Sequence, residues 1–368
     1  MTAVFETADE FGPEKVVHIS DAAAGLRAIV VIDNTAIGPS VGGIRMAPDV
    51  TLEECVRLAR AMSRKNAAAG LPHGGGKAVI FADPAMRSPE KESLMRAFAQ
   101  AIAQLTDFIP GPDMGTNEIC MAWVRDEIGR AVGLPLVIGG IPLDEIGATG
   151  HGVAVAAEVA EQFSAVALEG ARVAIQGYGA VGRHSAHHLA QKGARIVAVA
   201  DSKGTAVCAD GFDLSRLDAL KAEGQSVTSY PASEIMDGDA VITAECDILV
   251  PAARPDVINT ANAAEIKAML VVEAANIPAT KEAEIALRDR GVLVIPDFIA
   301  NAGGVICASV EYRGGTQSQA MATITEKIRR NTHAVLSQVH ENGSLPRDAA
   351  NALAEARLRE AMDLRRKF

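Results

Sequence analysis

The chain lacks the features that mark membrane, secreted and nucleic-acid-binding proteins. No apolar run approaches the roughly 20 residues that a membrane-spanning helix needs, and residues 1–15 are acidic, unlike a signal peptide. Asp+Glu 46 outnumber Lys+Arg 35, and the net charge of -11 argues against nucleic acid or an anionic membrane as a partner. We therefore expect a cytoplasmic protein with neither partner.

Cysteine is also scarce, and its spacing shows no CxxC pair or zinc pattern. We expect free thiols and no metal site. Internal repeats and low-complexity segments are missing too. What the chain does have is 368 residues with 49% hydrophobic content, enough for two globular domains. The cysteines are Cys55, Cys120, Cys208, Cys246 and Cys307.

A glycine fingerprint typical of dinucleotide-binding proteins lies in the second half of the chain. It follows an apolar strand at 173–175 and opens a helix expected at 180–191, so phosphates would lie at a helix amino terminus. Apolar segments at 196–199, 248–250, 270–272 and 292–295 predict further strands of a parallel sheet with helices on its faces. The fingerprint comprises Gly177, Gly179, Ala180, Val181 and Gly182.

Polar residues near the ends of these strands predict where the coenzyme binds. Asp201 stands nineteen positions after Gly182, close to the spacing of the carboxylate that binds an adenosine ribose. This favours NAD, but Ser202 and Lys203 could hold a 2′-phosphate, so NADP stays open. Later strands are followed by Ala252, Asn276 and Asn301, at the sheet edge where ligands bind.

The first third of the chain predicts a different α/β arrangement. Residues 26–32 form an apolar, β-branched strand. A helix begins at Thr51, with Glu54 completing a capping box, and its apolar face runs from Leu52 to Met62. We expect an α/β protein of two domains with the active site in the cleft between them. The first domain covers 1–145 and is completed by helices at 330–368, and a doubly wound Rossmann-type domain covers 146–329.

Two residues of the first domain carry acid/base chemistry. Lys77 follows three glycines, and a buried lysine close to a second cation, Lys65, favours a neutral amine that could activate water. Asp113 stands on a turn after an apolar run, where it could exchange a proton with an amine. The structural alternatives are an ion-paired or solvated Lys77 and an aspartate that only caps its turn.

These motifs resemble, in order and over nearly the whole chain, those of the glutamate/leucine/phenylalanine/valine dehydrogenase family. The resemblance implies reversible oxidative deamination of an L-amino acid to a 2-oxo acid and ammonium, with a nicotinamide dinucleotide as hydride carrier. It also implies a homo-oligomer, since relatives form dimers, hexamers or octamers. The matching segments are 41–45, 65–67, 71–77, 112–116, 148–150 and 301–305.

The resemblance assigns a role to each matching residue. Lys65 and the Gly42-Gly43 backbone would hold the α-carboxylate. Lys77 would activate the water that attacks an imine, and Asp113 would move the proton of the amino group. On the coenzyme side, Thr149 and Asn276 would orient the nicotinamide and its ribose.

The side-chain pocket departs from the glutamate branch of the family. In that branch a lysine stands where Val41 is and a serine where Ala308 is, and without them a substrate carboxylate would be buried unpaired. We therefore expect a leucine-, valine- or phenylalanine-like substrate. The pocket residues would be Val41, Met62, Gly111, Met114, Val305 and Ala308.

Two alternatives stay open. Residues 113–152 resemble the glutamate branch more closely, which favours glutamate as substrate. A catalytically silent NAD-binding scaffold or sensor would also keep the glycine fingerprint. It would have no need of Lys65, Lys77 and Asp113 together, and this argues against it.

Overall fold

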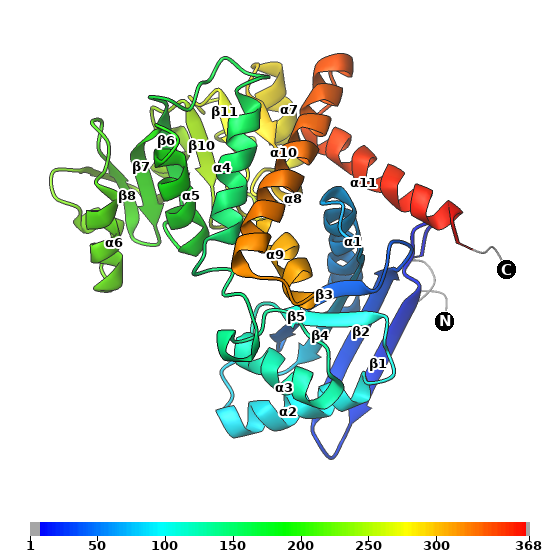
Figure 1. The fold of residues 1–368 in the computed structure, drawn as a ribbon. Helices are drawn as coiled ribbons and strands as arrows, with labels where there is room; N and C mark the ends of the chain where they lie inside the picture. Colours follow the sequence, from blue (N-terminus) through cyan, green and yellow to red (C-terminus); the bar gives the residue numbers. More distant parts are fainter. Residues whose placement is uncertain (1–7, 366–368) are drawn as a thin grey trace. The chain divides into compact units, whose positions relative to one another are not determined.

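The computed structural model describes residues 8–365, which divide into two compact units. Unit 1 comprises residues 8–142, 305–320 and 351–365. Unit 2 comprises residues 143–304 and 321–350. Two long carboxy-terminal helices, α10 (Gln317–Asn342) and α11 (Pro346–Asp363), each contribute residues to both units (Figure 1).

Unit 1 is built on a five-stranded sheet of order β1-β2-β4-β3-β5. The sheet is mixed, because β2 runs antiparallel to β1 and β4, whereas β3 runs parallel to β4 and β5. This order brings the ends of β3, β4 and β5 side by side, although they are far apart in the chain. The strands are β1 (Lys15–Asp21), β2 (Leu26–Asn34), β3 (Ser40–Ala47), β4 (Gly74–Phe81) and β5 (Phe108–Pro112).

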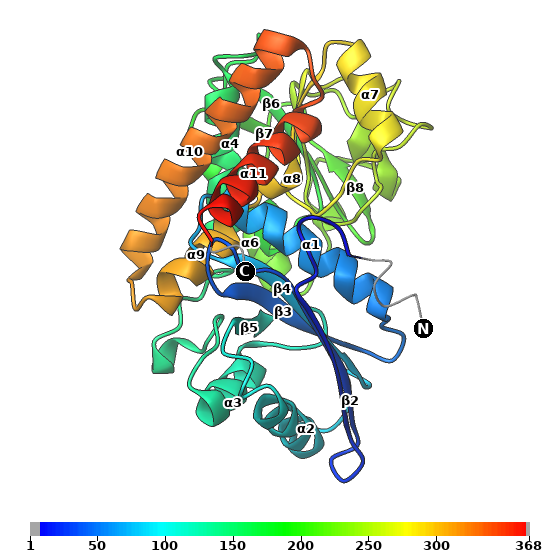
Figure 2. The same ribbon diagram turned by 90° about the vertical axis from the view of Figure 1, so that its right-hand side faces the viewer.

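Helices cover both faces of this sheet (Figure 2). Helix α1 (Leu52–Ala68) packs with Ile29 and Val31, while α2 (Ser88–Ala101) and α3 (Glu118–Ile128) pack with Ala28, Val30 and Ile32. Successive residues of a strand point to opposite faces, so a strand covered on both sides is apolar throughout. Strand β2 contains the predicted strand at 26–32, which is therefore confirmed.

Helix α1 begins as predicted, since the Thr51 hydroxyl accepts a hydrogen bond from the Glu54 backbone N–H. Its predicted apolar face is wrong in part. Leu58 and Met62 are only half-buried, whereas the polar Ser63 and Asn66 are buried.

The glycines of β4 explain why polar residues of α1 are buried. A Cβ atom on Gly75 would lie 2.0 Å from the Ser63 nitrogen, so only glycine lets α1 approach so closely. The Asn66 amide then donates to the Gly74 carbonyl at 2.7 Å. Strand β4 accordingly starts at Gly74, and Lys77 lies inside the strand.

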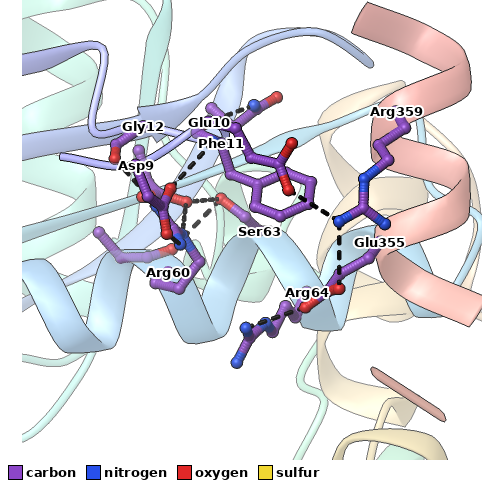
Figure 3. Close-up of polar contacts among 12 residues, drawn as sticks. Asp9, Glu10, Phe11, Gly12, Arg60, Ser63, Arg64, Glu355 and Arg359 are labelled. Atoms are coloured by element: carbon purple, nitrogen blue, oxygen red, sulfur yellow. Dashed lines mark hydrogen bonds and ion pairs between the residues drawn. The ribbon is translucent and has the colours of Figure 1, made fainter. Parts of the chain in front are cut away.

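Ion pairs join α1 to the amino-terminal segment and to the unit 1 part of α11 (Figure 3). Arg60 binds Asp9 at 2.6 Å and the fully buried Asp33 at 2.9 Å. Arg359 of α11 binds Glu10 at 2.8 Å, and both arginines lie over the ring of Phe11. These contacts hold the carboxy-terminal helix against the chain's first described residues.

Unit 2 is built on a seven-stranded sheet of order β12-β11-β10-β6-β7-β8-β9. The five strands predicted in this region are all present and parallel, which confirms the doubly wound fold. Two short antiparallel edge strands, β8 (Gly204–Val207) and β9 (Glu234–Met236), were not predicted. The parallel strands are β6 (Arg172–Gln176), β7 (Arg195–Asp201), β10 (Ile248–Pro251), β11 (Leu270–Val272) and β12 (Leu293–Ile295).

Helices pack on both faces of this sheet. Helix α7 (Lys281–Asp289) shares a core with Ala174 and Leu249. Helix α5 (Ala180–Ala190) lies on the opposite face, where Gly182 approaches Ile175, and α4 (Ala148–Ala160) packs against α5. The remaining helices are α6 (Leu214–Ala222), α8 (Asp297–Ala300), α9 (Gly303–Tyr312) and the short 3-10 helices η1 (Leu136–Ile138), η2 (Val227–Ser229) and η3 (Gly238–Thr243).

None of the helices in residues 8–365 combines the length and apolar character needed to cross a membrane. All five cysteines are free thiols, as predicted.

Candidate active site

Lys77 and Asp113 form an ion pair in unit 1. The Lys77 Nζ atom lies 2.9 Å from the Asp113 Oδ2 atom, and Arg45 Nε approaches the same oxygen at 2.8 Å. Lys77 belongs to β4 and Arg45 to β3, and Asp113 directly follows β5. A Cβ atom on Gly43 would lie 2.7 Å from the Asp113 Cβ atom, so the glycine leaves room for the pair.

The two cations keep Asp113 ionised. Burial opposes ionisation, but the Lys77 ammonium and the Arg45 guanidinium together hold the pKa of the Asp113 carboxyl below its usual value. Asp113 is therefore a carboxylate near neutral pH and can accept a proton. The Lys77 side chain is only 6% exposed and is ion-paired with this carboxylate.

Lys65 lies in the last turn of α1 and is half-buried. The neighbouring Asn66 binds the backbone of β4, so the carboxy-terminal end of α1 is held against the strand that bears Lys77. Gly42 lies in β3, where a Cβ atom would come within 1.7 Å of the Gly76 carbonyl oxygen. Its backbone is packed directly on β4 as a result.

An apolar cluster brings together two of the predicted pocket residues, Val41 and Ala308. Ile109 and Val132, which sequence reasoning did not single out, complete it. Among the described residues, Met62, Met114 and Val305 are not members of this cluster, and Met114 is 58% exposed. The predicted Gly111 borders the cluster, because a Cβ atom there would lie 3.0 Å from a methyl carbon of Val132.

Polar contacts fix the helix that carries Ala308. The Glu311 carboxylate of α9 accepts hydrogen bonds from the backbone N–H groups of Leu134, at 3.1 Å, and Ile141, at 2.8 Å. Two residues earlier in the same helix, Ser309 Oγ lies 3.0 Å from His73 Nε2. Burial, reinforced by Arg313, lowers the pKa of His73 to about 4, so the imidazole is neutral at pH 7. The cluster therefore has a rigid wall.

The glycine fingerprint of unit 2 has the geometry of a phosphate site. Gly177 adopts the left-handed conformation (φ +96), and a Cβ atom on Gly182 would lie 1.8 Å from the Gly177 carbonyl oxygen. Gly179 caps α5, and a Cβ atom there would meet nothing within 4 Å. Open space at the amino terminus of a helix fits a dinucleotide pyrophosphate. Ala180 and Val181 form the first turn.

Asp201 ends β7 as predicted, but its oxygens already have partners within the protein. They accept hydrogen bonds from Ser226 Oγ at 2.8 Å, Lys221 Nζ at 2.9 Å, and the backbone N–H groups of Val227 and Lys203 at 3.0 Å. Burial raises the pKa of Asp201, yet these donors hold it below its usual value. A ribose at this carboxylate would have to share or displace them. Ser202 is exposed beside it.

The other predicted coenzyme residues follow the carboxyl ends of neighbouring strands. Asn276 comes after β11 and Asn301 after β12, and the Asn301 amide nitrogen donates to Asn276 Oδ1 at 3.1 Å. Ala252 follows β10 and donates to the Gln176 carbonyl at 2.7 Å. Thr149 lies in the first turn of α4, where a Cβ atom on Gly304 would lie 3.5 Å from its hydroxyl.

Sequence reasoning missed two arginines. Arg45 stands in a matched motif two residues after Gly43. Alternate residues of a strand share one face of the sheet, so the sequence could have indicated that Arg45 lies on the same side as Gly43. No local signal pointed to Arg347, because its three partners lie at least 50 residues away in the chain. They are Glu273, Glu284 and Asp297. In the part of the chain that the structure describes, no group of three or more His, Cys, Asp or Glu side chains could hold a metal ion.

Two family models match the chain. Residues 139–366 match Glutamate/Leucine/Phenylalanine/Valine dehydrogenase, and residues 13–130 match the dimerisation domain of the same family. The chain belongs to this family. It is therefore an NAD(P)-dependent oxidoreductase that acts on the CH–NH2 group of an amino acid.

The chain is similar to individual proteins over most of their length. The chain is 39% identical to a glutamate dehydrogenase of Aeropyrum pernix over 356 residues, which cover 90% of this chain and 85% of that protein. The hetero-hexameric glutamate dehydrogenase of Thermus thermophilus, in its leucine-bound form, has a TM-score of 0.84 at 31% identity, covering 97% of this chain and 91% of that one. L-tryptophan dehydrogenase from Nostoc punctiforme has a TM-score of 0.78 at 27% identity, covering 98% and 99%.

Proposed function

We propose that this dehydrogenase acts on an apolar L-amino acid of the leucine, valine or phenylalanine kind. The reaction is the reversible oxidative deamination to the 2-oxo acid and ammonium. The observation that carries the proposal is that Val41 and Ala308, the positions of a lysine and a serine in the glutamate branch, pack with the apolar side chains of Ile109 and Val132. A substrate carboxylate buried against these side chains would be desolvated without compensation.

The proposed acid/base steps use the Lys77–Asp113 pair. Asp113, a carboxylate held between two cations, accepts a proton from the substrate ammonium group. After the hydride has left Cα, the substrate is an imine, and the Lys77 amine takes a proton from a water molecule as the water oxygen bonds to the imine carbon. Asp113 then returns its proton to the substrate nitrogen, and the C–N bond breaks as the hydroxyl proton is lost, which releases ammonium and the 2-oxo acid. Lys65 and the Gly42 backbone hold the α-carboxylate throughout.

The bound dinucleotide supplies the acceptor for the hydride that leaves the substrate Cα. The chain holds it with the open glycine turn at Gly179 and with the amides of Asn276 and Asn301. Thr149 and Ala252 border the same edge of the sheet. Either NAD or NADP fits this set, because Asp201 is engaged by Lys221 and Ser202 is exposed.

Glutamate is the second candidate substrate, because the Aeropyrum and Thermus relatives are named glutamate dehydrogenases. Against it stands Val41, at the position where the glutamate branch has a lysine. The Nostoc relative, by its name, acts on an apolar aromatic amino acid within a closely similar fold.

A panel of 2-oxo acids distinguishes the two substrates. We expect NADH or NADPH oxidation with ammonium to be faster with the 2-oxo acids of leucine, valine or phenylalanine than with 2-oxoglutarate. Val41→Lys should shift this preference toward 2-oxoglutarate, whereas Val41→Met, which alters volume without charge, should not. A wild type that prefers 2-oxoglutarate overturns the apolar assignment, and no turnover with any 2-oxo acid overturns the proposed catalysis.

We further propose that the chain forms a homo-oligomer through unit 1, because residues 13–130 match a dimerisation domain. Light scattering should give a mass that is a multiple of 38.3 kDa. A monomeric mass would contradict this.

A further inference from the structure

An arginine at the start of α11 binds three buried carboxylates of unit 2. The Arg347 guanidinium contacts Glu273 at 2.6 Å, Asp297 at 2.8 Å and Glu284 through its Nε atom. The exposed fractions of these side chains are 0%, 7% and 4%, so the carboxylates have lost nearly all their contact with water.

Two of these carboxylates belong to the segments that carry the coenzyme amides. Glu273 is the first residue after β11, in the segment that leads to Asn276. Asp297 is the first residue of α8, and Asn301 directly follows that helix. Backbone contacts tie the segments together. Asp297 N donates to Glu273 Oε2 at 2.9 Å, and Asn301 N donates to the Asp297 carbonyl at 2.7 Å.

The segment with Asn276 needs such support, because the next residue is strained. Ile277 has φ +48, a left-handed conformation that a β-branched residue rarely adopts. Its N–H group donates to Asp297 Oδ2 at 2.8 Å, while the other carboxylate oxygen of Asp297 binds Arg347. Strained residues of this kind persist only where their surroundings over-determine the backbone, as at ligand-binding sites.

Stability alone does not account for this cluster. One guanidinium faces three carboxylates, and a buried oxygen of Glu273 has no hydrogen-bond partner. Desolvation raises the pKa of Glu273 well above its usual value despite the arginine, so the buried carboxylate is energetically costly. Apolar residues of similar volume would fill such a space at lower cost. The cluster links the segment after β11 to the start of α8.

We propose that Arg347 is a positioning residue for the amide pair Asn276 and Asn301, and thereby for the nicotinamide end of the bound dinucleotide. The inference rests on the coenzyme roles proposed above for these two asparagines. It does not depend on which amino acid is the substrate. Arg347 would act through the carboxylates of Glu273 and Asp297.

Binding of two ligands to the full-length protein tests the proposal. The probes are the reduced coenzyme, NADH or NADPH, that the wild type binds more tightly, and ADP-ribose, which lacks nicotinamide. For Arg347→Lys we expect the dissociation constant of the reduced coenzyme to rise about tenfold, the effect of one lost hydrogen bond. That of ADP-ribose should stay within about twofold, since the fingerprint glycines are untouched.

Glu284→Gln is the matched control. It removes the negative charge of a partner of Arg347 on α7 while leaving both coenzyme segments intact. We expect it to leave the ratio of the two dissociation constants at the wild-type value, even if thermal stability falls. If Arg347→Lys does not fold, Asp297→Asn makes the same test. It weakens the contact to Arg347 and keeps a side-chain oxygen that accepts the hydrogen bond from the Ile277 N–H group.

If Arg347 had only a structural role, its substitution would weaken the binding of both ligands equally or of neither. Either result with a folded variant overturns the proposal, and so does a change of ratio in Glu284→Gln. Failure of the proposed catalysis is distinguishable, because it appears as a lack of turnover in the wild type while the binding ratio remains measurable.

Discussion

The Nζ atom of Lys77 lies 2.9 Å from the Oδ2 atom of Asp113. A base and an acid at hydrogen-bond distance can exchange a proton directly, without an intervening water. Strand β4, which bears Lys77, and strand β5, which ends just before Asp113, both pair with β3, so the sheet of unit 1 places the two residues close together.

Removing the Lys77 amine should abolish most of the activity. For Lys77→Ala we expect kcat in the deamination direction to fall at least about 100-fold, the usual contribution of a positioned acid/base group. Coenzyme affinity, measured by NAD(P)H fluorescence, should be unchanged. The control is Lys192→Ala, which breaks a lysine–glutamate pair of 3.0 Å on the surface of unit 2. Wild-type kcat in Lys77→Ala would contradict the proposed role.

Arg45 should control the pH dependence of the reaction. Arg45 helps to hold the pKa of Asp113 low, so its loss raises that pKa, and Asp113 then becomes protonated at a higher pH. In Arg45→Met the acidic limb of the kcat/KM profile for deamination should move to higher pH. Arg45→Lys keeps the charge and should move it less. An unshifted limb in Arg45→Met would show that Asp113 is not the base.

Substitution of Gly179 should weaken coenzyme binding without affecting folding. An added methyl group there meets no atom within 4 Å, so Gly179→Ala should keep the wild-type thermal unfolding midpoint. It would fill the space proposed for the pyrophosphate and weaken both NAD(P)H and ADP-ribose by at least about tenfold. Gly238→Ala, also in open space, is the control. Unchanged affinity would place the pyrophosphate elsewhere.

Glu311 should anchor the segment 134–141. Glu311→Ala leaves the buried N–H groups of Leu134 and Ile141 without their acceptor, at a cost of about 1–3 kcal/mol each. Hydrogen exchange followed by mass spectrometry should therefore show faster exchange of this segment. Glu326→Ala, an exposed glutamate on α10, should have no such effect. Wild-type protection in Glu311→Ala would mean that other contacts hold the segment.

Much of this molecule could be predicted from local patterns. The strand at 26–32, the helix that Thr51 caps and the five parallel strands of unit 2 each have a short-range signature, because apolar alternation and capping involve residues a few positions apart. The same is true of the Gly177–Gly182 turn, where glycine is required at Gly177 by the left-handed backbone and at Gly182 by the close approach of the Gly177 carbonyl. Lys77 and Asp113 were identified as candidates from their glycine-rich surroundings.

The partners of these residues could not be predicted in the same way. Sequence reasoning did not pair Lys77 with Asp113, whereas strand order brings this carboxylate to Lys77 and Arg45 to the same oxygen. The buried face of α1 was misjudged for a related reason. How closely a helix approaches a strand depends on the glycines of that strand, far away in sequence.

The amino-acid sequence by itself determined the family, the parallel sheet of unit 2 and the candidate residues for the chemistry, because each leaves a local mark. Only the tertiary structure decided the charge state of Asp113, the protein partners of Asp201 and the Arg347 cluster. These depend on groups that meet through long-range packing, and electrostatic energies vary steeply with distance and burial.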